Sequence, residues 1–139
     1  MNTPSPLRAV CLRHLETLRN GTEHFRMAAV SSTDGFPIAV INANPADTSS
    51  KTTAMAAALD GLSKTIAREF GLGALEGTVL ECEFGLFLCR QIHGPTRNLV
   101  LFVVMDEQVT YGHALWAIKN TARNMAESLR EMTEKNPAH

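Results

Sequence analysis

The apolar positions of this chain recur with two different periods, and the changes of period divide it into elements. Over residues 6–19 the apolar residues recur at three- and four-residue spacing, which places them on one face of a helix. The same spacing returns over residues 50–70 and from about residue 110 to 133. Between these segments lie short runs of strand-forming residues, which predict strands at 25–31, 36–41, 77–83, 86–92 and 98–105. The predicted order of elements is α-ββ-α-βββ-α.

Turn residues and charge indicate where the strands lie in a sheet. Asp34-Gly35, between the first two strands, supplies the positive φ of a tight hairpin turn. The strand at 98–105 is apolar on both faces, which is typical of the middle of a sheet that is covered on both sides. The strand at 77–83 carries two glutamates and is predicted to lie at an edge.

The second predicted helix has a continuous apolar face. Six residues at helical spacing form it: Met55, Ala58, Leu59, Leu62, Ile66 and Phe70. Candidate N-caps precede the helix, and two glycines end it; these are Asp47, Thr48 and Ser49, then Gly71 and Gly73.

Length, charge and apolar content narrow the class of protein. A chain of 139 residues is expected to form a single domain over residues 1–139. Lys and Arg number 13 and Asp and Glu 14, and one Trp and one Tyr are available to stack on bases, so nucleic acid is not an expected partner. The longest apolar run, 99–105, is far shorter than the roughly 20 residues of a membrane helix, so no membrane insertion is expected. The first ten residues do not resemble a secretory leader, which favours a cytoplasmic location.

Residues 45–52, PADTSSKT, lie between a predicted strand and a predicted helix, which is the order of parts in a nucleotide-binding P-loop. A P-loop needs glycines that let backbone N–H groups surround the phosphates, but the two glycine positions hold Pro45 and Ser50. Lys51 and Thr52 remain, in the first turn of the helix. A capped helix is the better interpretation, and no cofactor is expected.

No set of residues has the spacing of a catalytic or metal site. The five histidines show no HExxH or paired spacing, and neither GxSxG nor GxGxxG occurs. His14 falls on the apolar face of the first helix, where a hydrogen-bonded core or interface histidine is a better interpretation than a metal ligand. We therefore expect no catalytic residue, no metal and no enzymatic activity.

The three cysteines, Cys11, Cys82 and Cys89, are odd in number and lack CxxC spacing, which argues against a disulfide framework and a zinc site. If a hairpin turns at Phe84-Gly85, Cys82 faces Phe87 and is a diagonal neighbour of Cys89, about 7–8 Å away. That separation exceeds the ~4.4–6.8 Å of a disulfide. Packed thiols are the preferred interpretation, and a redox switch is the alternative.

The order of elements and three motifs resemble the roadblock family, the dynein-light-chain-type domains that in bacteria accompany Ras-like GTPases. The motifs are AAVSS at 28–32 with the following Asp-Gly turn and strand, the Ala-rich stretch 55–59 of the second helix, and the apolar strand 99–104 before the last helix. The similarity covers about residues 7–130, which would be the core of the domain.

The resemblance implies an α+β fold of profilin-like outline. Its five-stranded antiparallel sheet has the order 2-1-5-4-3, with the first and last helices on one face and the second on the other. It also implies a dimer, with a second copy or a paralogous chain, in which the third strands pair and the second helices pack side by side. The interface residues would be Met55, Ala58, Leu59, Leu62, Ile66, Thr78, Val79, Leu80, Glu81 and Cys82. A helix packed on its own sheet would show nearly the same pattern.

The function that the resemblance implies is a non-enzymatic regulator or adaptor of a small P-loop GTPase, which docks on the platform of the second helix and third strand. No arginine finger is identified, and Arg68, Arg90 and Arg97 are ordinary surface candidates. Two alternatives stay open. One is a dimeric scaffold subunit that binds no GTPase; the other is a small-molecule sensor of PAS-like outline, with a pocket lined by Phe84, Phe87 and Phe102.

Overall fold

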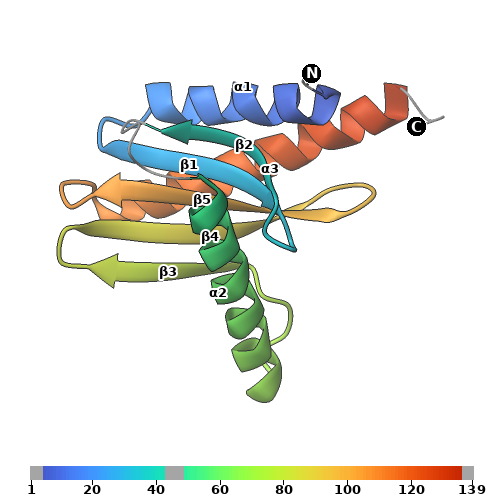
Figure 1. Cartoon of the computed structure of the whole chain (residues 1–139). Coiled ribbons are helices and arrows are strands. Elements are labelled where there is room, and N and C mark those ends of the chain that lie inside the picture. The colour runs from blue at the N-terminus through green and yellow to red at the C-terminus, as the bar shows by residue number, and fades with distance from the viewer. Residues whose placement is uncertain (1–4, 43–48, 136–139) are drawn as a thin grey trace.

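A computed structural model describes residues 5–42 and 49–135, so the predictions for Pro45, Asp47 and Thr48 lie outside the described residues. The elements follow the predicted order (Figure 1). They are α1 (Pro6–Asn20), β1 (Phe25–Ser32), β2 (Pro37–Asn42), α2 (Ser49–Glu69), β3 (Gly77–Cys82), β4 (Gly85–His93), β5 (Asn98–Asp106) and α3 (Tyr111–Lys135). None of the helices in these two ranges is long and apolar enough to cross a membrane.

The five strands form one antiparallel sheet of order β2-β1-β5-β4-β3, as expected. The predicted middle strand is β5, which pairs with β1 and β4 and is buried along most of its length. The predicted edge strand is β3, which pairs with β4 alone. Gly35 has the positive φ of +94° that the turn between β1 and β2 requires.

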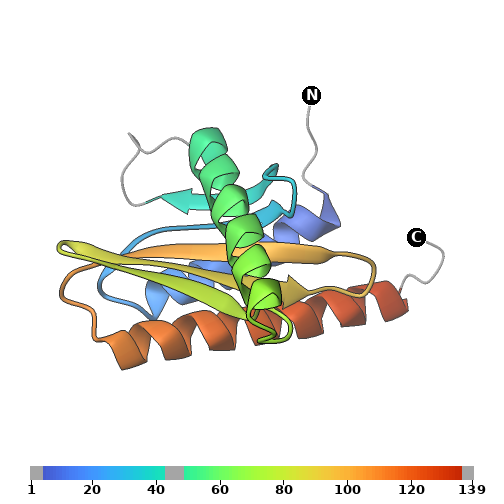
Figure 2. The same cartoon turned by 90° about the horizontal axis from the view of Figure 1, so that it is seen from below.

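Helices cover the two faces of the sheet unequally (Figure 2). On one face α1 and α3 pack on alternate residues of β5, among them Leu101, Val103 and Met105, and form the larger core cluster. On the other face α2 contributes Ala56 to a smaller cluster around Phe102. The expected arrangement of the three helices is therefore confirmed.

A hydrogen bond joins α1 and α3, the two helices that pack on the same face of the sheet. The Nε2 atom of His14 on α1 lies 2.8 Å from the hydroxyl oxygen of Ser128 on α3. His14 is partly buried there, so the prediction of a hydrogen-bonded histidine at this position is confirmed. Burial lowers the pKa of His14 below its ordinary value of 6.5, and the neighbouring Arg13 lowers it further.

The hairpin of β3 and β4 differs from the expected register. Cys82 pairs with Gly85 and not with Phe87, so the turn consists of residues 83 and 84. Gly85 belongs to β4, and the backbone of β5 passes so close that only glycine fits there: a Cβ atom would lie 2.4 Å from the carbonyl oxygen of Met105.

The corrected register separates the two hairpin cysteines. Cys89 pairs with Thr78, four positions along β3 from Cys82, so the expected diagonal contact is wrong. Cys82 is exposed, against the expectation of a packed thiol, while Cys11 and Cys89 are buried. Burial raises the pKa of Cys11 to about 11, against a smaller opposing effect of Arg97. Burial, with a contribution from Asp60, raises the pKa of Cys89 to about 12, so both thiols stay protonated at neutral pH.

The lowered pKa of His14 predicts a pH-dependent stability. Because the unfolded chain binds a proton at His14 more readily than the folded chain, His14 lowers the free energy of unfolding as the pH falls through 6.5. As the pH is lowered through this range, we expect the free energy of unfolding of His14→Gln to fall less than that of the natural chain. Urea unfolding curves at a series of pH values measure both. His93→Gln, at an exposed position, is the control. An unchanged pH dependence in His14→Gln would contradict this assignment.

Candidate functional site

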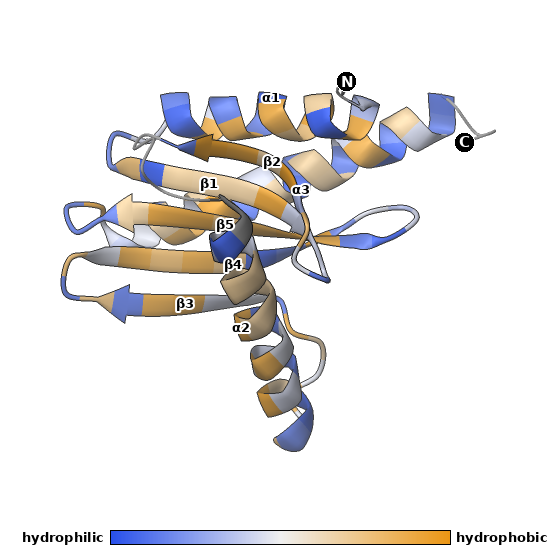
Figure 3. Ribbon diagram, viewed as in Figure 1, coloured by the Kyte–Doolittle hydropathy of each residue, from blue (hydrophilic) through white to orange (hydrophobic). Residues whose placement is uncertain are grey.

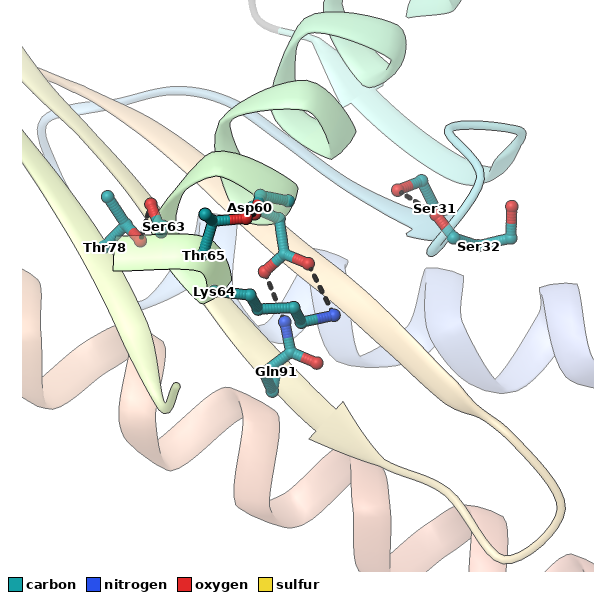
Figure 4. Close-up of polar contacts among 9 residues, drawn as sticks. Ser31, Ser32, Asp60, Ser63, Lys64, Thr65, Thr78 and Gln91 are labelled. Atoms are coloured by element: carbon teal, nitrogen blue, oxygen red, sulfur yellow. Dashed lines mark hydrogen bonds and ion pairs between the residues drawn. The ribbon is translucent and has the colours of Figure 1, made fainter. Parts of the chain in front are cut away.

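The helix α2 rests on the sheet through small and polar side chains. Its buried residues recur along one side of the helix: Thr53, Ala56, Asp60 and Ala67. The carboxyl group of Asp60 accepts a short hydrogen bond from the side-chain amide of Gln91 on β4, and both residues are buried (Figure 4). The ammonium group of Lys64, one turn further along α2, lies 2.9 Å from the other carboxyl oxygen of Asp60.

Two further contacts hold the helix against the strands. The hydroxyl of Thr78 on β3 donates a 3.0 Å hydrogen bond to that of Ser63 on α2 (Figure 4). Gly35, in the β1–β2 turn, lies so close to α2 that a Cβ atom there would be 3.3 Å from Ala54 Cα and from Ala57 Cβ. Small residues at this crossing therefore let the helix approach the turn closely.

This orientation turns the large apolar residues of α2 away from the sheet. Met55, Leu62 and Ile66 are exposed, Leu62 by 60%, and Phe70 just after the helix is exposed too. Burying apolar surface is the main favourable contribution to folding and association, so this exposed apolar row is a candidate interaction surface. We call Met55, Ala58, Leu62, Ile66 and Phe70 the outer face of α2. The hydropathy colouring shows apolar positions on the half of α2 that extends past the sheet (Figure 3).

The C-terminal half of α2 extends beyond β3, the edge of the sheet (Figure 1). The helix ends there in a backbone motif that satisfies its last carbonyl groups. Gly71 has φ +63° and donates to Arg68, and the N–H group of Leu72 donates to Ala67. Leu72 is itself exposed, so the chain carries apolar side chains around the end of the projecting helix and into the next segment.

The edge strand β3 lies beside this projection and, among the residues that the structure describes, has a neighbouring strand on one side only. Leu80, Glu81 and Cys82 are exposed, and Thr78 and Val79 are partly buried. An edge strand presents unpaired backbone N–H and C=O groups, which are a template for pairing with another strand. The outer face of α2 and the free edge of β3 are therefore two neighbouring unpartnered surfaces.

The predicted interface residues of α2, together with Val79 of β3, lie in three environments. Met55, Ala58, Leu62 and Ile66 are exposed on the outer face of α2. Leu59 is partly buried against the smaller core cluster, and Val79 is packed against the larger one, so these two also serve the fold. The interface predicted from the sequence did not include Phe70 and Leu72. Both could have been found in the sequence as large apolar residues next to a glycine at the end of a helix.

The structure does not bring Phe84, Phe87 and Phe102 together into the pocket that the small-molecule sensor alternative predicts. Phe87 and Phe102 stack with their ring centroids 5.5 Å apart, and Phe102 is fully buried in the smaller cluster. Phe84 lies in the β3–β4 turn and is 72% exposed, outside both core clusters. Two of the three rings fill the space between α2 and the sheet.

Candidate metal ligands are scattered over the part of the chain that the structure describes. Within residues 5–42 and 49–135, no group of three or more His, Cys, Asp or Glu side chains could hold a metal ion. Lys51, the lysine of the segment that resembles a P-loop, is in the first turn of α2 and exposed.

A family model described as the Roadblock/LC7 domain matches residues 14–93, more than half of the chain. The chain belongs to the roadblock family. This roadblock chain shares its fold with MglB in a tetrameric arrangement, at a TM-score of 0.77 and 19% identity over 91% of this chain and 93% of that one. The gliding protein MglB from Thermus thermophilus gives a TM-score of 0.77 at 18% identity, with the same coverage of both chains.

A Roadblock/LC7 domain from Streptomyces avermitilis is also similar, with a TM-score of 0.72 and 19% identity over 88% of this chain and 97% of that one. No curated protein sequence matches the chain. The predicted family and fold are therefore confirmed.

The contact between Asp60 and Gln91 predicts a loss of stability when it is removed. Asp60→Ala leaves the buried amide of Gln91 without its acceptor, which we expect to lower the free energy of unfolding by about 1–3 kcal/mol. Glu69→Ala, an exposed change on the same helix, should stay within about 0.5 kcal/mol of the natural chain. Urea unfolding followed by circular dichroism measures both, and equal effects would show that the contact does not hold α2.

Proposed function

We propose that this roadblock chain is a non-enzymatic regulator or adaptor that works as a dimer and docks a small Ras-like P-loop GTPase. The observation that carries the proposal is the exposed outer face of α2 beside the free edge of β3. Both surfaces belong to one corner of the molecule, so a second copy can cover them together, and the α2 helices and β3 strands of the dimer then form the platform on which the GTPase docks (Figure 1). The proposed interface comprises Met55, Ala58, Leu59, Leu62, Ile66, Thr78, Val79, Leu80, Glu81 and Cys82.

In the proposed dimer, β3 pairs with the β3 of a second copy or of a paralogous roadblock chain, and the two α2 helices lie side by side. Pairing satisfies the free backbone groups of the edge and continues the sheet. The half of α2 that extends past β3 then lies over the partner's sheet, which removes Leu62, Ile66 and Phe70 from water. Ala54, Ala58 and Gly61 are exposed on the same helix and allow close approach of the second helix.

The GTPase part of the proposal is supported by the family. Roadblock domains in bacteria accompany Ras-like GTPases, and the fold of this chain matches that of MglB, one of whose structures is described as a tetrameric arrangement. A P-loop is absent from residues 45–52 by sequence, so the nucleotide would be bound by the partner. The alternative is a dimeric scaffold that uses the same interface and binds no GTPase.

The first test is the oligomeric state. Leu62→Asp places a charge on the outer face of α2, and we expect it to convert a dimer into a monomer because an unpaired charge is costly to bury. Trp116→Asp is the matched control: Trp116 is exposed by the same 60% on α3, on the opposite face of the sheet. Light scattering after size-exclusion chromatography gives the masses. A natural chain that stays monomeric at high concentration would contradict the proposed interface.

The second test is GTPase binding. The chain is used to capture proteins from a soluble extract of its source, once with GDP and once with a non-hydrolysable GTP analogue, followed by mass spectrometry. We expect a small P-loop GTPase that is retained more strongly in one nucleotide state, and lost with Leu62→Asp but not with Trp116→Asp. Capture of larger proteins alone, without a GTPase in either state, would favour the scaffold.

A further inference from the structure

A hollow of about 550 Å³ lies between α3, β4 and the segment that leads into β3. It is on the α1/α3 side of the sheet, because its β4 residue Arg90 is two positions from Leu88 and from Ile92, shares their face of the strand, and these two belong to the larger core cluster. On the α3 side the wall contains Ala122 and Ala126, whose small side chains leave the space open. The outer face of α2 is on the opposite side of the sheet.

Four basic side chains line this hollow: Arg90, Lys119, Arg123 and Arg130. Glu76 is the one carboxylate among its lining residues, and His93 lies there as well. The chain as a whole has a net charge of −1, so this concentration of positive charge does not follow from a basic composition.

Of the four cations, Arg90 alone forms an ion pair within the described residues, although three glutamates of α3 lie within four positions of Arg130 in the sequence. Arg90 pairs with Glu76 at 3.3 Å, but the Glu76 side chain is 77% exposed, and such exposed pairs contribute little. Arg123 donates a 2.6 Å hydrogen bond to Asn120, which is uncharged. Within the described ranges, the side chains of Lys119 and Arg130 form no hydrogen bond or ion pair with the protein. Lys119, Arg123 and Arg130 are exposed, so solvent screens much of their mutual repulsion, and an anion that contacts several of them at once would offset the rest.

We propose that this hollow binds a small molecule that carries two or more phosphate groups. Arginine presents a planar fork of N–H donors that matches phosphate oxygens, and lysine adds a point charge, so three arginines and a lysine around one space fit a multiply charged phosphate compound. The volume lies in the range of small-molecule sites, and a concave site fits a free molecule better than a flat membrane surface. The proposal does not depend on the dimer or on a GTPase.

The test uses inorganic tripolyphosphate as the probe and the full chain as the protein. Isothermal calorimetry gives the affinity, and amide chemical shifts of the isotope-labelled chain locate the binding. The hollow variant is Lys119→Gln with Arg123→Gln; the matched control is Arg8→Gln with Arg13→Gln, two exposed residues of α1 with the same loss of charge. Both variants are first shown to unfold at the same urea concentration as the natural chain.

We expect tripolyphosphate to shift the amides around Arg90, Ala122 and Ala126 and to bind at least about tenfold more weakly to the hollow variant, with the control unchanged. Absence of binding, shifts elsewhere, or equal loss in both variants would overturn the proposal. A second experiment measures binding of the chain to vesicles that contain anionic phosphatidylglycerol, with phosphatidylcholine vesicles as the control. Binding to the anionic vesicles without binding of tripolyphosphate would overturn the small-molecule site and indicate a membrane surface.

Discussion

The rotation of α2 on its sheet determines which surfaces of this protein are left for partners. Asp60 is held by Gln91 of β4 and by Lys64 of its own helix. Gly35 in the β1–β2 turn and two alanines of α2 let the helix lie close to that turn. A helix normally turns its largest apolar side chains to its own sheet. Here the contact side is polar and narrow, so Leu62 and Ile66 face outward. A stable fold and an exposed apolar row coexist because the buried polar groups of this contact find partners within the protein.

Most of the fold could be predicted from the sequence because it depends on local patterns. The two apolar periods locate the helices and strands to within a few residues, and the charge of β3 and the apolar character of β5 indicate the edge and the middle of the sheet. The register of β3 and β4 could not be predicted, because two adjacent turn positions are compatible with the sequence. In the folded sheet the turn consists of residues 83 and 84, and Gly85 pairs with Cys82 at the start of β4.

The candidate surfaces were predicted to different extents. The apolar face of α2 is evident from spacing alone, but whether it packs inward depends on Asp60 meeting Gln91, a residue 31 positions further along the chain. The basic hollow is formed by three segments that no sequence pattern connects, and its Arg90 looked like an ordinary surface residue. The sheet separates the two surfaces, since α2 covers one face and α3 the other (Figure 2). A partner that covers the outer face of α2 alone would leave the hollow accessible, whereas one that also pairs with β3 would lie next to residues 74–76, which line the hollow.

The most direct test of this account is amide hydrogen exchange along β3. If its free edge and the outer face of α2 are covered by a second chain, the N–H groups of β3 that point away from β4 should exchange slowly in concentrated solution and faster on dilution, while the amides of β5 stay protected throughout. Exchange of those β3 amides at the rate of exposed loops, at every concentration, would contradict the claim that this corner of the molecule is a partner interface.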